Sequence, residues 1–180
     1  YLADAPHWEG KLVALKEIRT DHLSEREYSL LNGRFLQEAA MLMSLQHPGL
    51  PQIVEFFAQG PCYYLALEWI PGKNLEEYIL EQGPAQEADV LTWGLQISAV
   101  LEYLHSRHPN PIILGDLKPA NVVVPFEGSL RVIDFGVARH ANLEGRNEIA
   151  LVSPGFSAPE QYKGTAVDER GDIYSLGATL

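Results

Sequence analysis

The chain has 180 residues, 46% of them hydrophobic, and a formal net charge of −11 at pH 7. This composition is ordinary for a globular protein, and the length is enough to bury one sizeable core. The acidic balance argues against a nucleic-acid surface, which would normally present a basic face, so we expect no nucleic-acid partner. Cys62 is the only cysteine, which excludes a disulfide within the chain.

The first part of the chain predicts a small β-sheet with one helix. Residues 11–19 alternate enough to form a strand, and residues 53–57 and 63–69 predict two more strands. Residues 35–45 carry apolar side chains at helical spacing. Pro71-Gly72 then interrupts the chain, and we place the boundary between two lobes there.

The second part is predicted to be mainly helical. An apolar stripe at helical spacing runs over residues 89–106, and Asp89 is a plausible N-cap for that helix. Residues 122–124 and 130–133 read as a short hairpin that closes around Glu127-Gly128. The polar loop that precedes this hairpin carries the residues with the clearest chemistry.

Two polar motifs point to phosphoryl transfer. Asp116, Lys118 and Asn121 share one short loop, and Asp134 follows a strand-like run. Phosphoryl transfer needs a carboxylate to accept the proton of the attacking hydroxyl, and oxygen ligands to hold Mg²⁺ on a triphosphate. Each motif alone could be an ordinary polar turn. Two further segments lie before and after the pair: Val13-Ala14-Leu15-Lys16 and Ala158-Pro159-Glu160.

In this order the segments resemble the signature set of protein kinases, most closely the bacterial eukaryotic-like (Hanks-type) serine/threonine kinases. The resemblance implies an α+β fold with two lobes. Residues 1–70 would form part of an N-lobe with a small antiparallel sheet, one main helix and the hinge. Residues 71–180 would form part of a mostly helical C-lobe. The implied activity is transfer of the γ-phosphate of ATP, with Mg²⁺, to Ser/Thr hydroxyls of protein substrates.

The resemblance also assigns roles to the two polar motifs. Asp116 would accept the proton of the attacking hydroxyl, and Lys118 would neutralise charge on the transferring phosphoryl group. Asn121 and Asp134 would hold Mg²⁺. A lysine at position 118 resembles the serine/threonine branch of the family rather than the tyrosine branch.

Nucleotide binding would involve residues from both lobes. Lys16 would bind the triphosphate, with Glu38 as its ion-pair partner, because a lysine buried in a strand needs an anionic partner. Taken alone, Lys16 reads better as a surface strand lysine, and Glu38 as a solvated helix residue. Leu67 would be the gatekeeper, and the backbone of residues 68–70 would bind adenine. The expected nucleotide contacts besides Lys16, Glu38 and Asp134 are Ala14, Leu67, Glu68, Ile70 and Val123.

Three further residues would support the site. Ser153 would lie beside Asp116, Glu160 would pair with an arginine beyond residue 180, and Asp172 would hold the catalytic loop from below. Four histidines, His22, His105, His108 and His140, are interpreted as ordinary surface or packing residues, since none of the six histidines pairs with a Cys or His at metal-ligand spacing.

The sequence departs from the family at the residues before Asp116. Leu114-Gly115 stands in place of the usual His-Arg pair, which resembles the non-RD kinases. Residues 137–152 contain no Ser, Thr or Tyr, so a phosphate acceptor and the arginine that would bind its phosphate are absent together. We therefore expect activity not to depend on phosphorylation of this stretch.

Two alternatives remain open. A pseudokinase, which binds nucleotide or acts as a scaffold without catalysis, is favoured by the missing His-Arg pair. The intact set argues against it: Lys16, Asp116, Lys118, Asn121 and Asp134. A small-molecule kinase of the aminoglycoside type shares an aspartate-to-asparagine loop, but residues 157–160 resemble the peptide platform of protein kinases.

The ends of the chain suggest a fragment truncated on both sides. No Met stands at position 1, and residues 173–180 read as a helix that stops short. The glycine-rich phosphate loop of the family would precede Tyr1, and the isolated fragment is expected to be inactive and poorly stable. We expect a cytoplasmic protein, or one held at the cytoplasmic face of a membrane by a tether outside these residues.

Overall fold

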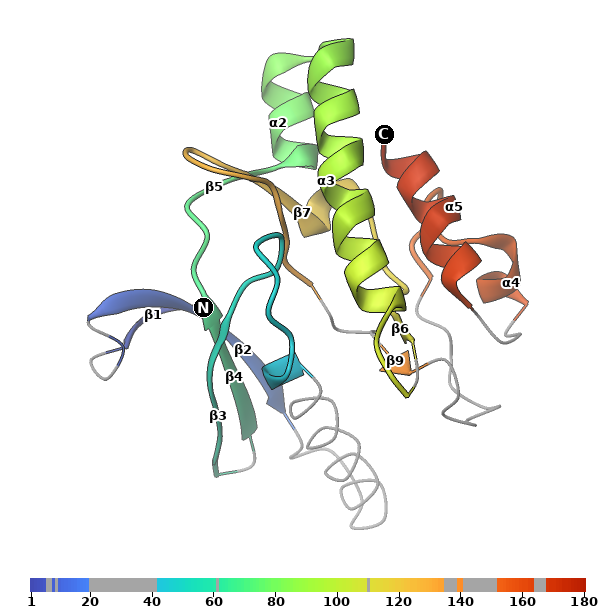
Figure 1. Ribbon diagram of the computed structural model, residues 1–180. Coiled ribbons are helices and arrows are strands. Elements are labelled where there is room, and N and C mark those ends of the chain that lie inside the picture. The colour runs from blue at the N-terminus through green and yellow to red at the C-terminus, as the bar shows by residue number, and fades with distance from the viewer. Residues whose placement is uncertain are drawn as a thin grey trace. The chain divides into compact units, whose positions relative to one another are not determined.

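The computed structural model describes residues 1–5, 8, 10–19, 42–60, 62–109, 111–134, 139–140, 152–163 and 168–180 (Figure 1). The chain forms two compact units, one of Tyr1–Gln46 with Pro51–Ile70 and one of His47–Leu50 with Pro71–Leu180. The first is built on an antiparallel sheet and the second carries most of the helices, which confirms the predicted α+β class. Within these described ranges, no helix is both long and apolar enough to cross a membrane.

The first unit is a four-stranded antiparallel sheet in the order β1-β2-β4-β3. The strands are β1 (Leu2–Ala5), β2 (Lys11–Arg19), β3 (Ile53–Gln59) and β4 (Cys62–Glu68). The three predicted strands are therefore confirmed, with small shifts at the ends of β3 and β4. Val13 in β2 and Tyr63 and Leu65 in β4 are buried. Leu65 lies opposite Lys16 and Val13 lies opposite Glu68, so these buried side chains come from both faces of the sheet.

The predicted helix over residues 35–45 falls mostly outside the described residues. Leu42 and Met43 are helical, and the chain leaves the helix before Leu45. Leu42 and Leu45 are both buried, as their places in the predicted apolar stripe require. Glu38 lies outside the described residues.

The second unit begins with β5 (Gly72–Asn74), α2 (Leu75–Gln82) and α3 (Glu87–His105). Asn74 caps α2, because its side chain accepts from Glu77 N at 2.8 Å while the Glu77 carboxylate accepts from Asn74 N at 3.1 Å. The prediction that Asp89 caps α3 is wrong. The helix starts earlier, and Asp89 lies in its first turn, where a negative charge still suits the helix dipole.

The apolar stripe of α3 forms the core of this unit. Ile97, Val100, Leu101 and Leu104 are almost completely buried. α2 and α3 meet through Tyr78 and Trp93, whose rings pack edge to face with centroids 5.4 Å apart. α5 (Glu169–Thr179) contacts α3 on another side (Figure 1).

Short strands connect these helices. β7 (Val122–Pro125) pairs with β5 and with β8 (Arg131–Val132), which confirms the predicted hairpin. β6 (Ile112–Ile113) pairs with β9 (Arg139–His140). The 3₁₀ turn η1 (Pro119–Asn121) and helix α4 (Pro159–Tyr162) complete the elements of this unit.

The segment His47–Leu50 belongs to the second unit through its contacts with α3 and β8. The His47 ring packs on Tyr103 with centroids 5.0 Å apart, and its Nδ1 accepts from Gly49 N at 3.0 Å. Burial, together with the nearby charge of Arg131, lowers the pKa of His47 and favours the neutral ring that this hydrogen bond needs. Gly49 O in turn accepts from Val132 N at 2.9 Å, which holds the strand leading to Asp134.

Candidate active site

The loop between β6 and β7 is held by apolar anchors that alternate with polar residues. Leu114 and Leu117 are buried, with β6 before them and β7 after them. The 3₁₀ turn closes the loop through a hydrogen bond from Asn121 N to Lys118 O at 2.9 Å. Because Leu117 is buried between Asp116 and Lys118, the two charged side chains are held on the outer side of the loop.

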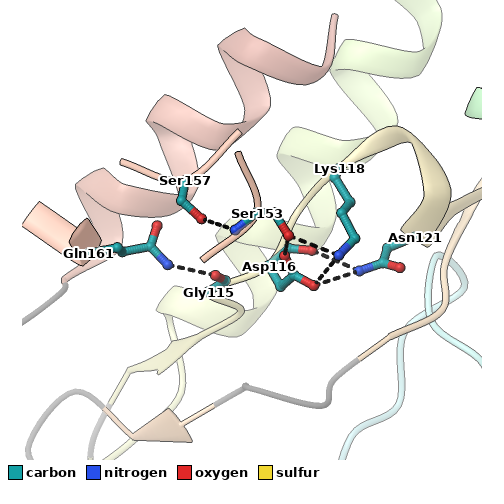
Figure 2. Close-up of polar contacts among 7 residues, drawn as sticks. All are labelled: Gly115, Asp116, Lys118, Asn121, Ser153, Ser157 and Gln161. Atoms are coloured by element: carbon teal, nitrogen blue, oxygen red, sulfur yellow. Dashed lines mark hydrogen bonds and ion pairs between the residues drawn. The ribbon is translucent and has the colours of Figure 1, made fainter. Parts of the chain in front are cut away.

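Asp116 is the centre of a polar cluster (Figure 2). Lys118 Nζ donates to Asp116 Oδ2 at 2.7 Å, and Asn121 Nδ2 donates to the same oxygen at 3.2 Å and to Asp116 O at 2.9 Å. Ser153 Oγ donates to Asp116 Oδ1 at 2.5 Å and accepts from Lys118 Nζ at 2.9 Å. The structure thus brings together Asp116, Lys118, Asn121 and Ser153. In this arrangement the Asp116 carboxylate accepts from the Ser153 hydroxyl, and the Lys118 ammonium group donates to both.

Asn121 and Asp134 are linked through the backbone. Ile133 N donates to Asn121 O at 2.9 Å, so the residue before Asp134 is tied to the catalytic loop. The Asn121 amide nitrogen faces Asp116, and its amide oxygen points the other way (Figure 2). Phe135 and Gly136, which complete the second motif, lie outside the described residues.

This pair of oxygen ligands fits Mg²⁺. Among the described residues, no group of three or more His, Cys, Asp and Glu side chains could hold a metal ion by itself. Mg²⁺ in phosphoryl-transfer sites is usually bound by one or two carboxylates together with substrate phosphates and water, rather than by a full protein cage. A carboxylate at position 134 and an amide oxygen at position 121 therefore suit a metal that arrives with a triphosphate.

Asp172 on α5 holds the start of the loop that carries Asp116. Its carboxylate is completely buried and accepts from Leu114 N at 2.9 Å and Gly115 N at 2.8 Å. His105 Nε2, at the end of α3, lies 2.8 Å from the same carboxylate. A buried carboxylate needs such partners because an unpaired charge is very unfavourable in the protein interior. His105, interpreted from the sequence as a surface or packing residue, thus has Asp172 as a specific partner.

Gly115 has a backbone conformation that suits glycine. Its φ is 78°, in the left-handed region, where other residues are strained by their Cβ atom. Its N–H donates to Asp172, and its carbonyl accepts from Gln161 Nε2 at 2.8 Å. The residue that stands in place of the usual arginine is thus fixed through its backbone on both sides.

We predict that Gly115→Ala lowers the stability of the second unit by about 1–2 kcal/mol, the usual penalty for a Cβ atom in the left-handed region. Gly128→Ala is the matched control, because Gly128 also has a positive φ of 89° and a Cβ there would meet nothing within 4 Å. Denaturant unfolding of both variants measures the penalty at each site. A Gly115→Ala variant as stable as the parent, beside a destabilised Gly128→Ala, would contradict the strain at Gly115.

Lys16 and Ala14 lie in β2. Ala14 is opposite Leu67 and Lys16 is opposite Leu65 in the neighbouring strand β4. The Lys16 side chain is exposed. Burial therefore gives no reason to expect an anionic partner for this lysine. The expected pairing of Lys16 with Glu38 stays a prediction, because Glu38 lies outside the described residues.

The residues expected to bind adenine through their backbone, 68–70, lie at the end of β4 and directly after it. Glu68 N donates to Gln52 O at 2.8 Å, and the Glu68 carboxylate accepts from Gln52 N at 3.1 Å. Leu67 is half-buried and Ile70 is buried. In the second unit, Val123 is buried in β7. The arginine partner expected for Glu160, which is half-buried in α4, stays a prediction.

Comparison with known proteins identifies the family. The model of the protein kinase domain matches residues 4–180. Serine/threonine-protein kinase PrkC of Bacillus subtilis is 32% identical over 171 residues, which cover 93% of this chain and 25% of that protein. Serine/threonine-protein kinase C of Synechocystis is 38% identical over 161 residues, which cover 84% of this chain and 29% of that protein. Serine/threonine-protein kinase PknB of Mycobacterium tuberculosis is 30% identical over 176 residues, which cover 93% of this chain and 27% of that protein.

The chain therefore belongs to the protein kinase domain family, which confirms the resemblance drawn from its motifs. The chain spans about a quarter of the length of the curated relatives it matches. Protein kinases in general use ATP and Mg²⁺, and the oxygen ligands at positions 121 and 134 are of the type this chemistry needs.

Proposed function

We propose that the protein containing this chain is an ATP-dependent serine/threonine protein kinase. The observation that carries the proposal is the hydrogen bond from Ser153 Oγ to Asp116 Oδ1 at 2.5 Å, with Lys118 Nζ within 2.9 Å of the same hydroxyl. These contacts support a role for the Asp116 carboxylate in accepting a proton from a hydroxyl. They also support a role for the neighbouring Lys118 cation in stabilising a transferring phosphoryl group.

In the proposed reaction, the hydroxyl oxygen of a substrate Ser or Thr attacks the γ-phosphorus of ATP. The bond from that phosphorus to the β,γ-bridging oxygen breaks, ADP leaves, and Asp116 accepts the hydroxyl proton. Lys118 would stabilise the negative charge on the phosphoryl oxygens. Asn121 and Asp134 would hold Mg²⁺, which when bound neutralises charge on the phosphates.

Other residues would bind the nucleotide or support the loop. Lys16 would bind the triphosphate, and Asp172 would position the loop that carries Asp116. Adenine would contact the backbone that follows β4, with these residues around it: Ala14, Leu67, Glu68, Ile70 and Val123. The partner of Lys16 is proposed to be Glu38, and Glu160 would stabilise the segment that receives the substrate. A cytoplasmic location follows from the need for ATP and is part of the proposal.

Two observations support Ser/Thr as the acceptor. The names of the relatives describe serine/threonine kinases. Lys118 binds both Asp116 and Ser153, so the lysine typical of that branch is in contact with the proposed base. Nucleic acid is not among the proposed substrates.

The acceptor is tested by giving the full-length protein Mg-ATP and peptides that differ only in Ser, Thr or Tyr at one position. An aminoglycoside is included as a small-molecule acceptor. We expect phosphate on the Ser and Thr peptides alone. Transfer to the aminoglycoside or only to the Tyr peptide would contradict the proposal. ATP binding without transfer to any acceptor would identify a pseudokinase.

A further inference from the structure

Gln161 connects two parts of the site that are far apart in the sequence. Its Nε2 donates to the carbonyl of Gly115 at 2.8 Å (Figure 2). Its Oε1 accepts from Ala158 N at 2.9 Å. The side chain is only 3% exposed. Its amide therefore links the first residues of α4 directly to the residue before Asp116.

This link matters because Gly115 cannot fix its own conformation. A glycine moves between left-handed and other backbone conformations at little energetic expense. The peptide between Gly115 and Asp116 would therefore turn easily unless outside contacts held it. Asp172 binds the Gly115 N–H on one side, and Gln161 binds the Gly115 carbonyl on the other.

The segment that contains Gln161 is also tied to Asp116 itself. Ser153 Oγ donates to Asp116, and Ser153 N donates to Ser157 Oγ at 2.8 Å (Figure 2). Ser175 Oγ on α5 donates to Phe156 O at 2.9 Å. None of these hydrogen bonds requires a phosphate group, and Gly115 has no side chain that could bind one.

We propose that Gln161 is a positioning residue for Asp116: by holding the Gly115 carbonyl, it couples residues 152–162 to the catalytic loop without phosphorylation. The coupling rests on the proposed kinase function. The alternative role is capping alone, in which Gln161 only accepts from Ala158 N at the start of α4, as Gln or Glu at this helix position often does. The two roles differ in one atom, since capping uses Oε1 and positioning uses Nε2.

Two variants separate these roles. Gln161→Met removes both hydrogen bonds at similar size. Gln161→Glu keeps an oxygen for Ala158 N, but an ionised carboxylate cannot donate to Gly115 O. Gln96→Met is the matched control, because the Gln96 side chain accepts from Leu130 N at 2.8 Å in the same unit, away from the catalytic loop.

Turnover in the full-length protein is measured for each variant, per folded molecule, with the KM for ATP. We expect Gln161→Met to lower kcat at least about tenfold, since small displacements of a catalytic group have large effects on rate. The KM for ATP should stay near that of the parent, and Gln96→Met should keep the parent kcat. An unchanged kcat in Gln161→Met, or an equal loss in Gln96→Met, would overturn the proposal.

The pH dependence of Gln161→Glu gives a readout that a capping role would not produce. A protonated carboxyl can donate to Gly115 O, and burial of this position favours the neutral form of a carboxyl. The titratable groups bound to the same loop or to each other are Asp116, Lys118, Asp172 and His105. The kcat ratio of variant to parent should therefore rise as pH falls from about 8 to about 6, toward the range where such a carboxyl titrates. Should Gln161→Met fail to fold, this ratio decides: a value near one throughout would overturn the proposal.

Amide hydrogen exchange distinguishes failure of this proposal from failure of the kinase function. If the parent transfers no phosphate, the proposed function fails, but the link can still be tested. Faster exchange over residues 114–116 in Gln161→Met than in Gln96→Met would support the link. Equal exchange in the two variants would overturn it.

Discussion

Asp116→Asn in the full-length protein is expected to reduce kcat for peptide phosphorylation by a factor of about a hundred or more, the usual contribution of a general base. The asparagine has nearly the shape of the aspartate, but its amide cannot accept the hydroxyl proton. Its amide oxygen can take the place of Asp116 Oδ2, which accepts from Lys118 and Asn121, and its N–H then faces Ser153 Oγ, which now donates to Oδ1. Steady-state kinetics with a Ser peptide measures the loss.

Binding of ATP should be largely unaffected by this substitution, because the proposed contacts to nucleotide and metal are made by other residues. Calorimetry of the variant with Mg-ATP tests that separation. Asp89→Asn is the control, since Asp89 is an exposed carboxylate in the first turn of α3. Parent-like turnover in Asp116→Asn would remove Asp116 from the mechanism.

Asp134→Ala is expected to abolish most of the effect of Mg²⁺ on ATP affinity. Asp134 is the one carboxylate of the motif set proposed to bridge metal and phosphates, so its loss should weaken Mg-ATP binding at least about tenfold. ATP titrations at several Mg²⁺ concentrations measure the dependence. Affinity without Mg²⁺ should change little.

Asp134→Asn provides the graded comparison for this site. Asparagine retains an oxygen ligand but loses the charge. The effect of Mg²⁺ on ATP affinity in this variant should therefore lie between the effects in the parent and in Asp134→Ala. The control variant Asp89→Ala should show the same effect of Mg²⁺ on ATP affinity as the parent. If Mg²⁺ strengthens ATP binding equally in Asp134→Ala and the parent, the metal role of Asp134 is wrong.

Local signals in the sequence were sufficient for the main elements. The alternation of β2 and the apolar stripe of α3 predict the elements that the structure contains, because their side chains face a sheet interior or a helix-packed core. The strand β5 has only three residues, Gly72–Asn74, with no apolar alternation, and it was not predicted. The start of α3 was misplaced because its N-cap, Gln86, makes no side-chain capping bond.

The motif residues of the site could be predicted because three of them, Asp116, Lys118 and Asn121, lie on one loop and the 3₁₀ turn that follows it. The resemblance also implies that Asp172 holds this loop, but the contacts of His105 and Gln161 could not be predicted. His105 and Asp172 are 67 residues apart, and Gln161 and Gly115 are 46 residues apart. Such pairs have no spacing rule, because they depend on how α3, α4 and α5 pack against the loop. Within the loop itself, the positive φ of Gly115 is the feature that indicates a need for hydrogen bonds from other elements to hold its backbone.

The most direct test of the account is transfer of labelled γ-phosphate from ATP to a serine peptide by the full-length protein, with and without Mg²⁺. The account predicts steady, Mg²⁺-dependent formation of phosphoserine, which mass spectrometry locates on the peptide. Tight Mg-ATP binding with no phosphoserine formed would contradict it.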